Sequence, residues 1–282
     1  MKSGTRLPAD TSLGAVRLRI PSLERSLDFY AGKLGLHLHS RDADTAYLCA
    51  SAASDPLVVL HEMPSTTSRP EYAIGLYHFA ILLPDRAALA RAVIGLLEAK
   101  WRFTGFSDHG VSEAAYLSDP DGNGIELYAD RERAAWPRQN GALAMYTQPL
   151  DLEDLLSTAQ PAAPQIASGT RMGHIHLHVS SLERARAFYE GGLGFDVTAD
   201  TYPGALFLAA GGYHHHVGTN VWARRPSPPN AAGLLDWTLR VPGETARGEL
   251  RERLLAQRAR IDDVADGWRV SDADGNAAVI TA

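Results

Sequence analysis

The sequence predicts an α+β fold in which four βαβββ modules close into two open β-barrels. The main observation is an internal repeat, because GAVRLRIPSLERSLDFYAGKLGL (14–36) returns as GHIHLHVSSLERARAFYEGGLGF (173–195). Two weaker copies of the same strand–helix plan begin at Leu76 and Leu235. The turn sequence DPDGNGIEL also has a later counterpart, DADGNAAVI, at residues 272–280. Repeats of this length indicate a duplicated structural unit.

Each module begins with an alternating strand that is followed by a helix. In the two strong copies Ser-Leu-Glu-Arg opens the helix, and Ser22 and Ser181 can accept hydrogen bonds from its first free N–H groups. Glu24 and Glu183 add negative charge to the first turn, where the helix dipole favours it. We therefore expect both helices to start directly after these serines.

The modules are expected to work in pairs. One helix covers only one face of a sheet, whereas two modules can close a sheet around an interior to which alternate residues of each strand point. We expect modules at about residues 12–62, 75–131, 172–224 and 233–282. Residues 1–135 then form a first half and 171–282 a second, joined by an Ala-, Gln- and Pro-rich segment, 136–170, with one short helical candidate, LDLEDLLSTA.

A β-hairpin is predicted between Asp108 and Tyr128. Alternation runs through SEAAYL, Asp-Pro and Asn-Gly give a tight turn, and IELY resumes as a second strand. Glu126 interrupts this second, apolar strand. It is either a solvent-facing glutamate on the wet face of the strand or an inward carboxylate that binds a metal, since burying a lone carboxylate is costly.

Histidines gather at matching strand positions of modules two and three. His78 lies in the first strand of module two, and His174, His176 and His178 share one face of the first strand of module three. A lone strand histidine is usually structural, but three on one face would each need a buried partner. The last strand of module three contains a further run, which could equally be an exposed edge or turn: His214, His215 and His216.

The alternation of a strand would place His214 and His216 on the face opposite His215. Modules two and three hold nearly all the metal-type ligands. The matching positions of module four hold Asp236 and Val279, while those of module one hold Ala15, Arg17 and Arg19, and its last strand ends in His61 and Glu62. A full site therefore assembles if module two pairs with module three and module one with module four. Two imidazoles and one carboxylate on adjacent strands are the ligand set of non-haem Fe(II) oxygenases.

Composition limits the kinds of molecule that the protein could bind and the compartment in which it could work. The net charge of −6 and the lack of a Lys/Arg-rich run argue against nucleic acid. The single cysteine, Cys49, excludes an intramolecular disulfide and fits a reducing compartment. Because no apolar run approaches the length of a membrane span and the polar N-terminus has no signal sequence, we expect a soluble cytoplasmic protein. Assembly into a homo-oligomer is left open.

These stretches resemble the vicinal oxygen chelate superfamily, which comprises glyoxalases, bleomycin resistance proteins and extradiol dioxygenases. Within it the chain is similar to the type I extradiol ring-cleaving enzymes, such as the catechol 2,3-dioxygenases of bacilli. Their signature falls on His109, Tyr116, Asp119-Pro120, Gly122 and Glu126. The likeness extends over SLERSLDFY, GLYHFAILLPDR, GHIHLHVSSL and AGGYHHHVGTNVWA. Unlike the best-known members, this chain has the signature in its second module.

The resemblance implies specific roles for these side chains. The metal ligands would be His78, Glu126 and His174, while His109 and Tyr116 would contact the substrate or oxygen. The acid–base residue would be His215, with His214, His216, His109 and His176 as further candidates. An aromatic wall could come from four side chains that are equally plausible as plain core: Phe79, Tyr116, Trp222 and Trp237.

The activity implied is Fe(II)-dependent cleavage of catechol or a related dihydroxylated aromatic, with O2 as co-substrate and both of its atoms inserted. Mn(II) or another divalent metal is an alternative to iron. A second hypothesis is a glyoxalase-type isomerase or lyase, which would use a fourth protein ligand and a redox-inert metal. A third is a non-enzymatic sequestering protein, against which the His and Glu ligands argue, because an apolar trap needs no metal.

Overall fold

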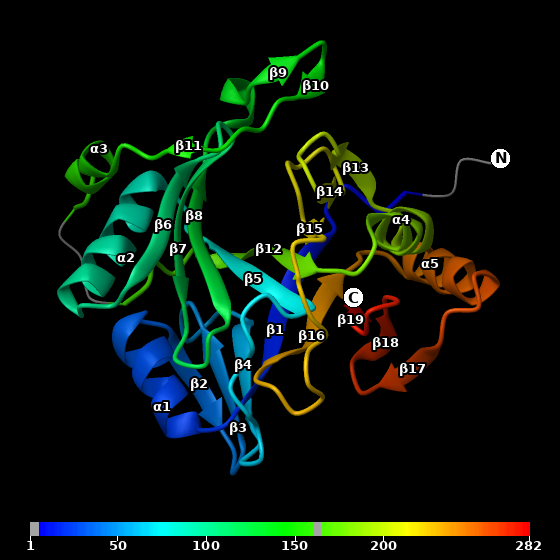
Figure 1. Cartoon of the computed structure of the whole chain (residues 1–282), viewed down its shortest axis with the longest axis horizontal. Helices are drawn as coiled ribbons and strands as arrows, with labels where there is room; N and C mark the ends of the chain where they lie inside the picture. The colour runs from blue at the N-terminus through cyan, green and yellow to red at the C-terminus, as the bar shows by residue number, and fades with distance from the viewer. Residues whose placement is uncertain (1–5, 161–164) are drawn as a thin grey trace.

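The computed structural model describes residues 6–160 and 165–282. Its strands form two large curved sheets, and helices cover their outer faces, which confirms the predicted α+β class (Figure 1). We call the nine-stranded sheet the first cup and the eight-stranded sheet the second cup. In this part of the chain no helix is long and apolar enough to cross a membrane.

The first cup combines strands from modules two and three with one from the connecting segment. Its strand order is β11-β6-β7-β8-β5-β12-β15-β14-β13. At its centre β5 and β12 run antiparallel, so strands about ninety residues apart in sequence become neighbours (Figure 1). The strands are β5 (Gly75–Leu82), β6 (Phe103–Asp108), β7 (Ser112–Ser118), β8 (Gly124–Asp130), β11 (Gln148–Pro149), β12 (Arg171–His178), β13 (Asp196–Ala199), β14 (Ala205–Ala209) and β15 (Val217–Asn220).

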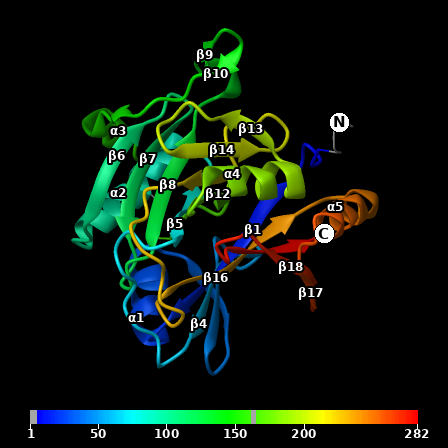
Figure 2. The same ribbon diagram turned by 45° about the vertical axis from the view of Figure 1, so that its right-hand side comes forward.

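The second cup is built in the same way from modules one and four. Its order is β17-β18-β19-β16-β1-β4-β3-β2, with β1 antiparallel to β16 at the centre. The central strands of the two cups contact each other, β1 against β12 and β16 against β5 (Figure 2). The strands are β1 (Ser12–Ile20), β2 (His37–Arg41), β3 (Thr45–Cys49), β4 (Pro56–Glu62), β16 (Gly233–Arg240), β17 (Ile261–Val264), β18 (Gly267–Ser271) and β19 (Ala277–Thr281).

The helices begin where the sequence predicts. Ser22 and Ser181 accept hydrogen bonds from the backbone N–H groups of Arg25 and Arg184, which confirms both predicted caps. The helical elements are α1 (Leu23–Leu27), which continues as the π-helix η1 (Asp28–Lys33), η2 (Arg133–Ala135), α2 (Arg86–Glu98), α3 (Leu152–Ser157), α4 (Leu182–Arg186) with the π-helix η3 (Ala187–Leu193), and α5 (Glu244–Ala256). A small hairpin of β9 (Arg138–Gln139) and β10 (Ala142–Leu143) lies in the connecting segment.

Strand β8 separates core from cup interior by alternation. Ile125 and Leu127 are fully buried in the main hydrophobic core, to which α2 contributes on the outer face. Glu126 and Tyr128 point to the other face, because successive strand residues alternate. The predicted hairpin is also confirmed, since β7 and β8 pair antiparallel across the Asp119–Asn123 turn.

A repeated hydrogen bond ties the modules together at this turn. The Tyr30 hydroxyl of η1 donates to the Asp119 carboxylate at 2.9 Å, and the Tyr189 hydroxyl of η3 donates to Asp272 at 3.0 Å. Burial raises the pKa of both tyrosines well above its usual value, so both phenols remain donors. The helix of module one therefore holds the hairpin turn of module two, and the helix of module three holds that of module four.

Candidate metal centre

Three of the predicted ligands meet in the middle of the first cup. His78 on β5, Glu126 on β8 and His174 on β12 each offer a ligand atom, and these atoms lie within 4.8 Å of one another. The Nε2 atoms of both histidines are 3.1 Å from the same carboxylate oxygen, Oε2 of Glu126. All three are buried, with 6 %, 3 % and 1 % of their surface exposed. Neighbouring strands thus bring residues from two modules to one point.

The protonation states suit a metal. Burial alone would raise the pKa of Glu126, but the adjacent His174 and His78 outweigh it and hold that pKa well below its usual value. Burial lowers the pKa of His174 to about 4 despite the nearby carboxylate. The group therefore combines an ionised carboxylate with a neutral His174 imidazole, the forms in which these side chains bind metals.

Of two buried ring nitrogens without a hydrogen-bond partner, the one on His78 supports the presence of a metal. Although His78 Nε2 lies 3.1 Å from Glu126, it makes no aligned hydrogen bond to any described residue, and His174 Nδ1 has no such partner either. A buried polar atom without a partner costs about 1–3 kcal/mol. A divalent ion between the two imidazoles and the carboxylate would engage the nitrogen of His78, so the residues present fit such an ion.

His109 and Tyr116 form a pair beside these ligands. Tyr116 is the cross-strand partner of Glu126, and its ring centre lies 5.7 Å from that of His78. The Tyr116 hydroxyl is 2.7 Å from His109 Nε2, and His109 Nδ1 is 3.0 Å from the backbone oxygen of Tyr146. Because a carbonyl can only accept, a neutral His109 carries its proton on Nδ1 and accepts from Tyr116 at Nε2. Burial raises the pKa of Tyr116 well above its usual value, which keeps it a donor.

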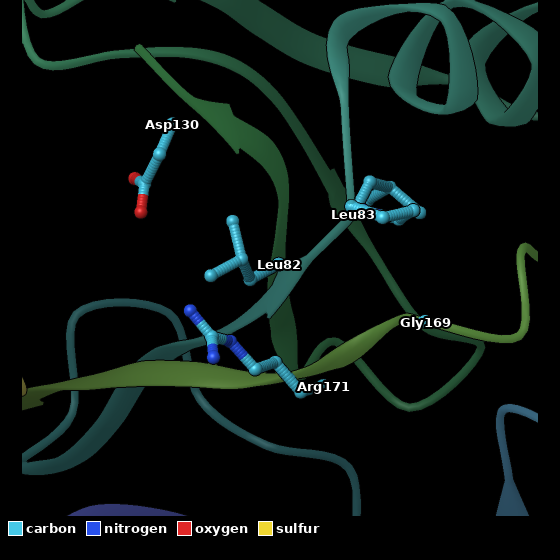
Figure 3. Close-up of a pocket in the computed structure, with 6 residues that line it drawn as sticks. Leu82, Leu83, Asp130, Gly169 and Arg171 are labelled. Carbon is cyan, nitrogen blue, oxygen red and sulfur yellow. The ribbon is translucent and has the colours of Figure 1, made fainter. Parts of the chain in front are cut away.

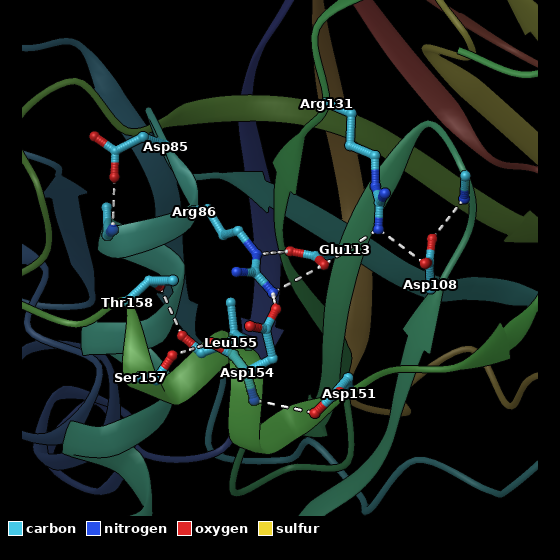
Figure 4. A network of polar contacts seen from close by, with 12 residues as sticks. Asp85, Arg86, Asp108, Glu113, Arg131, Asp151, Asp154, Leu155, Ser157 and Thr158 are labelled. Atoms are coloured by element: carbon cyan, nitrogen blue, oxygen red, sulfur yellow. Dashed lines mark hydrogen bonds and ion pairs between the residues drawn. The ribbon is translucent and has the colours of Figure 1, made fainter. Parts of the chain in front are cut away.

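A charged network fixes the loop that carries His109. Arg131 donates to the Asp108 carboxylate at 2.8 Å and to Glu113 at 3.2 Å, and Asp108 also accepts from the N–H of Gly110 (Figure 4). Arg86 at the start of α2 pairs with the same Glu113 and with Asp154 of α3 (Figure 4). The network lies on the outer side of β7, because Glu113 and the inward Tyr116 are an odd number of residues apart.

The run of His214, His215 and His216 does not belong to the last strand of module three, where the sequence analysis placed it. It lies in a bend before β15 starts at Val217, so strand alternation does not apply to it. His215 packs on His174 with ring centres 4.0 Å apart, and burial lowers the pKa of His215 well below its usual value. His214 is fully buried behind it, and its Nδ1 is 2.7 Å from Nδ1 of His215. His216 Nδ1 instead accepts the backbone N–H of Ala210 at 3.1 Å.

His176 and His178 share one partner. The side-chain amide of Asn220 on β15 lies 3.0 Å from His176 Nε2 and, through its oxygen, 2.5 Å from His178 Nδ1. Burial lowers the pKa of both histidines, so both are neutral near pH 7. Gly218 gives His176 its place, since a Cβ there would meet its ring at 2.9 Å. The structure therefore assigns these two to a hydrogen-bonded wall of the cup.

A rim of aromatic side chains lies next to this wall. Its main member is Tyr77, which the sequence analysis did not identify. The β5–β12 pairing shifts register between Leu76 and His78, so Tyr77 is left unpaired. The Tyr77 ring lies 4.8 Å from that of His78 and 5.7 Å from that of Trp222, and 40 % of Tyr77 is exposed. Tyr202 also contacts Trp222. Of the other wall candidates, Phe79 and Trp237 are fully buried in the hydrophobic core and do not reach the cup.

The second cup holds a different set of side chains. Its buried Asp236 lies 3.9 Å from Arg17 and 3.8 Å from Arg269. In the described ranges, the group of three candidate ligands in the first cup is the one that meets the geometric requirement for a metal site. Arg17 and Arg269, which lie nearest to Asp236, cannot act as metal ligands because a guanidinium group has no acceptor.

The fold and this ligand set define a class of protein. The family model of the Glyoxalase/Bleomycin resistance protein/Dioxygenase superfamily matches residues 12–127 and 171–276, so the chain belongs to that superfamily, as its sequence predicts. A catechol-2,3-dioxygenase of Bacillus subtilis (strain 168) is 44 % identical over 276 residues, which cover 95 % of this chain and 96 % of that enzyme.

Solved structures agree on the fold. A Bacillus subtilis (strain 168) protein superposes with a TM-score of 0.71 at 12 % identity, covering 98 % of this chain and 86 % of the other. Glyoxalase I from Zea mays gives a TM-score of 0.61 at 16 % identity, covering 96 % and 92 %. At these identities the likeness shows the fold alone.

Proposed function

We propose that the protein is an extradiol ring-cleaving dioxygenase that acts on catechol or a related dihydroxylated aromatic. The observation that carries the proposal is the buried group of His78, Glu126 and His174, whose ligand atoms lie within 4.8 Å of one another. The 44 % identity to a catechol-2,3-dioxygenase supports the same activity. In this proposal modules two and three build the metal cup, and modules one and four build the other.

Fe(II) is the metal that this ligand set favours. Two histidines and one carboxylate leave coordination positions open, which is typical of non-haem Fe(II) oxygenases. When bound, the ion supplies the Lewis acidity and redox chemistry that join a chelated diol to dioxygen. A glyoxalase-type site would need a fourth protein ligand, whereas the group found in the described residues contains three.

Two hydrogen-bonding side chains lie next to the ligands, one beside His174 and one beside His78. His215, neutral and packed against His174, can take a proton from a catechol hydroxyl, which must ionise before it chelates a metal. Tyr116 lies beside His78, and its hydroxyl can turn the proton that it shares with His109 toward an oxygen that develops negative charge. The residues therefore divide proton removal and proton donation between them.

The aromatic rim suits the ring of such a substrate. The ring centres of Tyr77 and Trp222 lie within 6 Å of the ring centre of His176, and the ring centre of Phe207 lies 5.1 Å from that of His215. Flat aromatic rings pack well in edge-to-face and offset arrangements with one another. We infer that these side chains hold the catechol ring while its two oxygens face His78 and His174.

The test is turnover with and without oxygen. Protein loaded anaerobically with Fe(II) and mixed with catechol should form no product until air is admitted, and should then consume one O2 per catechol and yield a yellow ring-opened semialdehyde. Protein loaded with Zn(II), which has no redox chemistry, is the matched control and should stay inactive. Isomerisation of a thiol adduct of an α-ketoaldehyde without oxygen, together with no oxygen uptake, would favour the glyoxalase-type alternative.

A further inference from the structure

Asp130 lies at the far end of the strand that carries Glu126, and the proposed function gives it no role. It lines a cavity of about 290 Å³ together with Leu82 and Arg171. Figure 3 shows the Asp130 carboxylate and the Arg171 guanidinium on opposite sides of Leu82. The Asp130 side chain is 23 % exposed, yet both of its oxygens have hydrogen-bond partners, His214 and Tyr213.

The first oxygen of Asp130 contacts the histidine run. Its Oδ1 lies 2.9 Å from His214 Nε2, and His214 Nδ1 lies 2.7 Å from His215 Nδ1. An ionised carboxylate only accepts hydrogen bonds, so a neutral His214 must carry its proton on Nε2. Its Nδ1 is then an acceptor, and the short contact requires a proton on Nδ1 of His215. The lone pair of His215 is left on Nε2, the nitrogen that a base would use.

The second oxygen of Asp130 is held by a tyrosine. The Tyr213 hydroxyl donates to Oδ2 at 2.9 Å and lies 2.8 Å from the Tyr128 hydroxyl. Because Tyr213 gives its proton to Asp130, its oxygen accepts from Tyr128. The Tyr213 ring also packs on His214 with centres 4.0 Å apart. Asp130 is therefore fixed by two donors and cannot turn away from His214.

We propose that Asp130 and His214 are positioning residues that set the tautomer and the ring orientation of His215. In catalytic triads a carboxylate orients the histidine that acts as base. Here Asp130 contacts His214, and His214 in turn contacts the proposed base His215. The inference rests on the proposed function for its catalytic meaning, but the tautomer itself is a property of the protein that needs no substrate.

The first measurement reads the tautomer directly. In Zn(II)-loaded protein, which is diamagnetic, the ¹⁵N signals of histidine rings distinguish nitrogens that carry a proton from those that do not. We expect His214 to be protonated at Nε2 alone in the wild type, and Asp130→Ala to shift it toward Nδ1. Wild-type protein with His214 protonated at Nδ1 would overturn the inference, whether or not catechol is cleaved.

The second measurement is kinetic. Asp130→Ala in the Fe(II) enzyme should lower kcat by about 10-fold or more, out of the ~10²–10⁴-fold that a general base supplies, with KM and iron content unchanged. Asp130→Asn keeps one accepting oxygen and replaces the other with a donor NH2 group, so its kcat should lie between those of the wild type and Asp130→Ala. It is also the variant to use if Asp130→Ala does not fold. Arg171→Gln is the control, since Arg171 lines the same cavity without contacting His214 or Tyr213.

The outcomes separate the two proposals. If wild-type protein shows the expected tautomer but cleaves no catechol, the proposed function fails and the positioning inference stands. If Asp130→Ala keeps full kcat, or loses iron in proportion to its activity, the positioning inference fails while the dioxygenase proposal is untouched.

Discussion

Three consecutive histidines contact three different parts of the molecule. His214 faces Asp130, His215 packs against the candidate ligand His174, and His216 accepts a backbone N–H. These partners, and not the residue type, decide what each imidazole can do. Sequence reasoning could find the run but not order it, because the order depends on a bend whose path is set by distant contacts.

Replacing the histidines one at a time tests this division. His215→Gln should lower kcat with catechol by about 10²–10⁴-fold, the usual contribution of a general acid–base group, while iron content stays normal. His216→Gln should stay close to wild type, since a glutamine oxygen can also accept the N–H of Ala210. Steady-state kinetics under air and metal analysis on the same samples give both readings. Full turnover by His215→Gln would move the acid–base role to another residue.

Glu126 offers the sharpest test of the metal centre. Glu126→Ala removes the one carboxylate that both imidazoles contact, so the protein should fall from about one tightly bound divalent ion per chain to almost none. Glu113→Gln is the matched control, because Glu113 is a buried carboxylate on the neighbouring strand that pairs with Arg86 and Arg131 outside the cup. Metal analysis after dialysis decides, and a normal metal content in Glu126→Ala would refute the assignment.

The turn between β7 and β8 sets the position of Glu126 relative to Tyr116. Asp119 accepts the backbone N–H groups of Asp121 and Asn123 within the turn and the hydroxyl of Tyr30 from outside it. The turn itself was predictable from Asp-Pro and Asn-Gly, and the caps of both helices from their serines. The contact with Tyr30 was not predictable, since it joins residues 89 positions apart.

Tyr30→Phe should therefore weaken both stability and metal binding. Removing a buried hydrogen bond to a carboxylate costs about 1–3 kcal/mol of the free energy of unfolding. Tyr189→Phe removes the equivalent bond to Asp272 and should cost a similar amount, but it leaves the Glu126 turn intact. Urea unfolding and metal titration of both variants separate the effects. Equal metal affinity in the two variants would contradict the link between Tyr30 and the site.

Five imidazoles have a pKa that burial lowers. Burial lowers the pKa of His174 to about 4 and that of His216 to about 3, and it lowers the pKa of His176, His178 and His215 as well. The unfolded chain binds protons at these groups below a pH of about 6.5, whereas the folded protein does not. The stability that they contribute is present above that pH and is lost as the pH falls.

The metal-free protein should accordingly unfold more easily in acid. For His174 alone, the lowered pKa corresponds to about 3 kcal/mol of stability that disappears between roughly pH 6.5 and pH 4. Urea midpoints measured at several pH values should show the decline, and His174→Gln should reduce it. His39→Gln, at an exposed position, should leave the slope unchanged. A flat profile in the wild type would show that these imidazoles are not buried in their neutral form.

The family and the α+β architecture could be predicted from the repeats and the ligand types, because both depend on patterns that repeat along the chain. Two details of the site could not be predicted from the sequence, for a physical reason. The unpaired Tyr77 depends on a local shift in strand register, and the contact of Asp130 with His214 joins residues from different modules. Neither leaves a periodic signal in the sequence.

The hydrogen bond from Tyr30 to Asp119 changes what a shortened version of this protein could be. All three candidate ligands lie between residues 78 and 174, and the flanking His215 is not far beyond. A fragment from residue 78 to residue 215 would therefore keep the candidate ligands and His215. It would lose Tyr30, whose hydroxyl anchors the hairpin turn next to Glu126. Module one, which contributes none of the three candidate ligands, thus fixes the turn next to one of them.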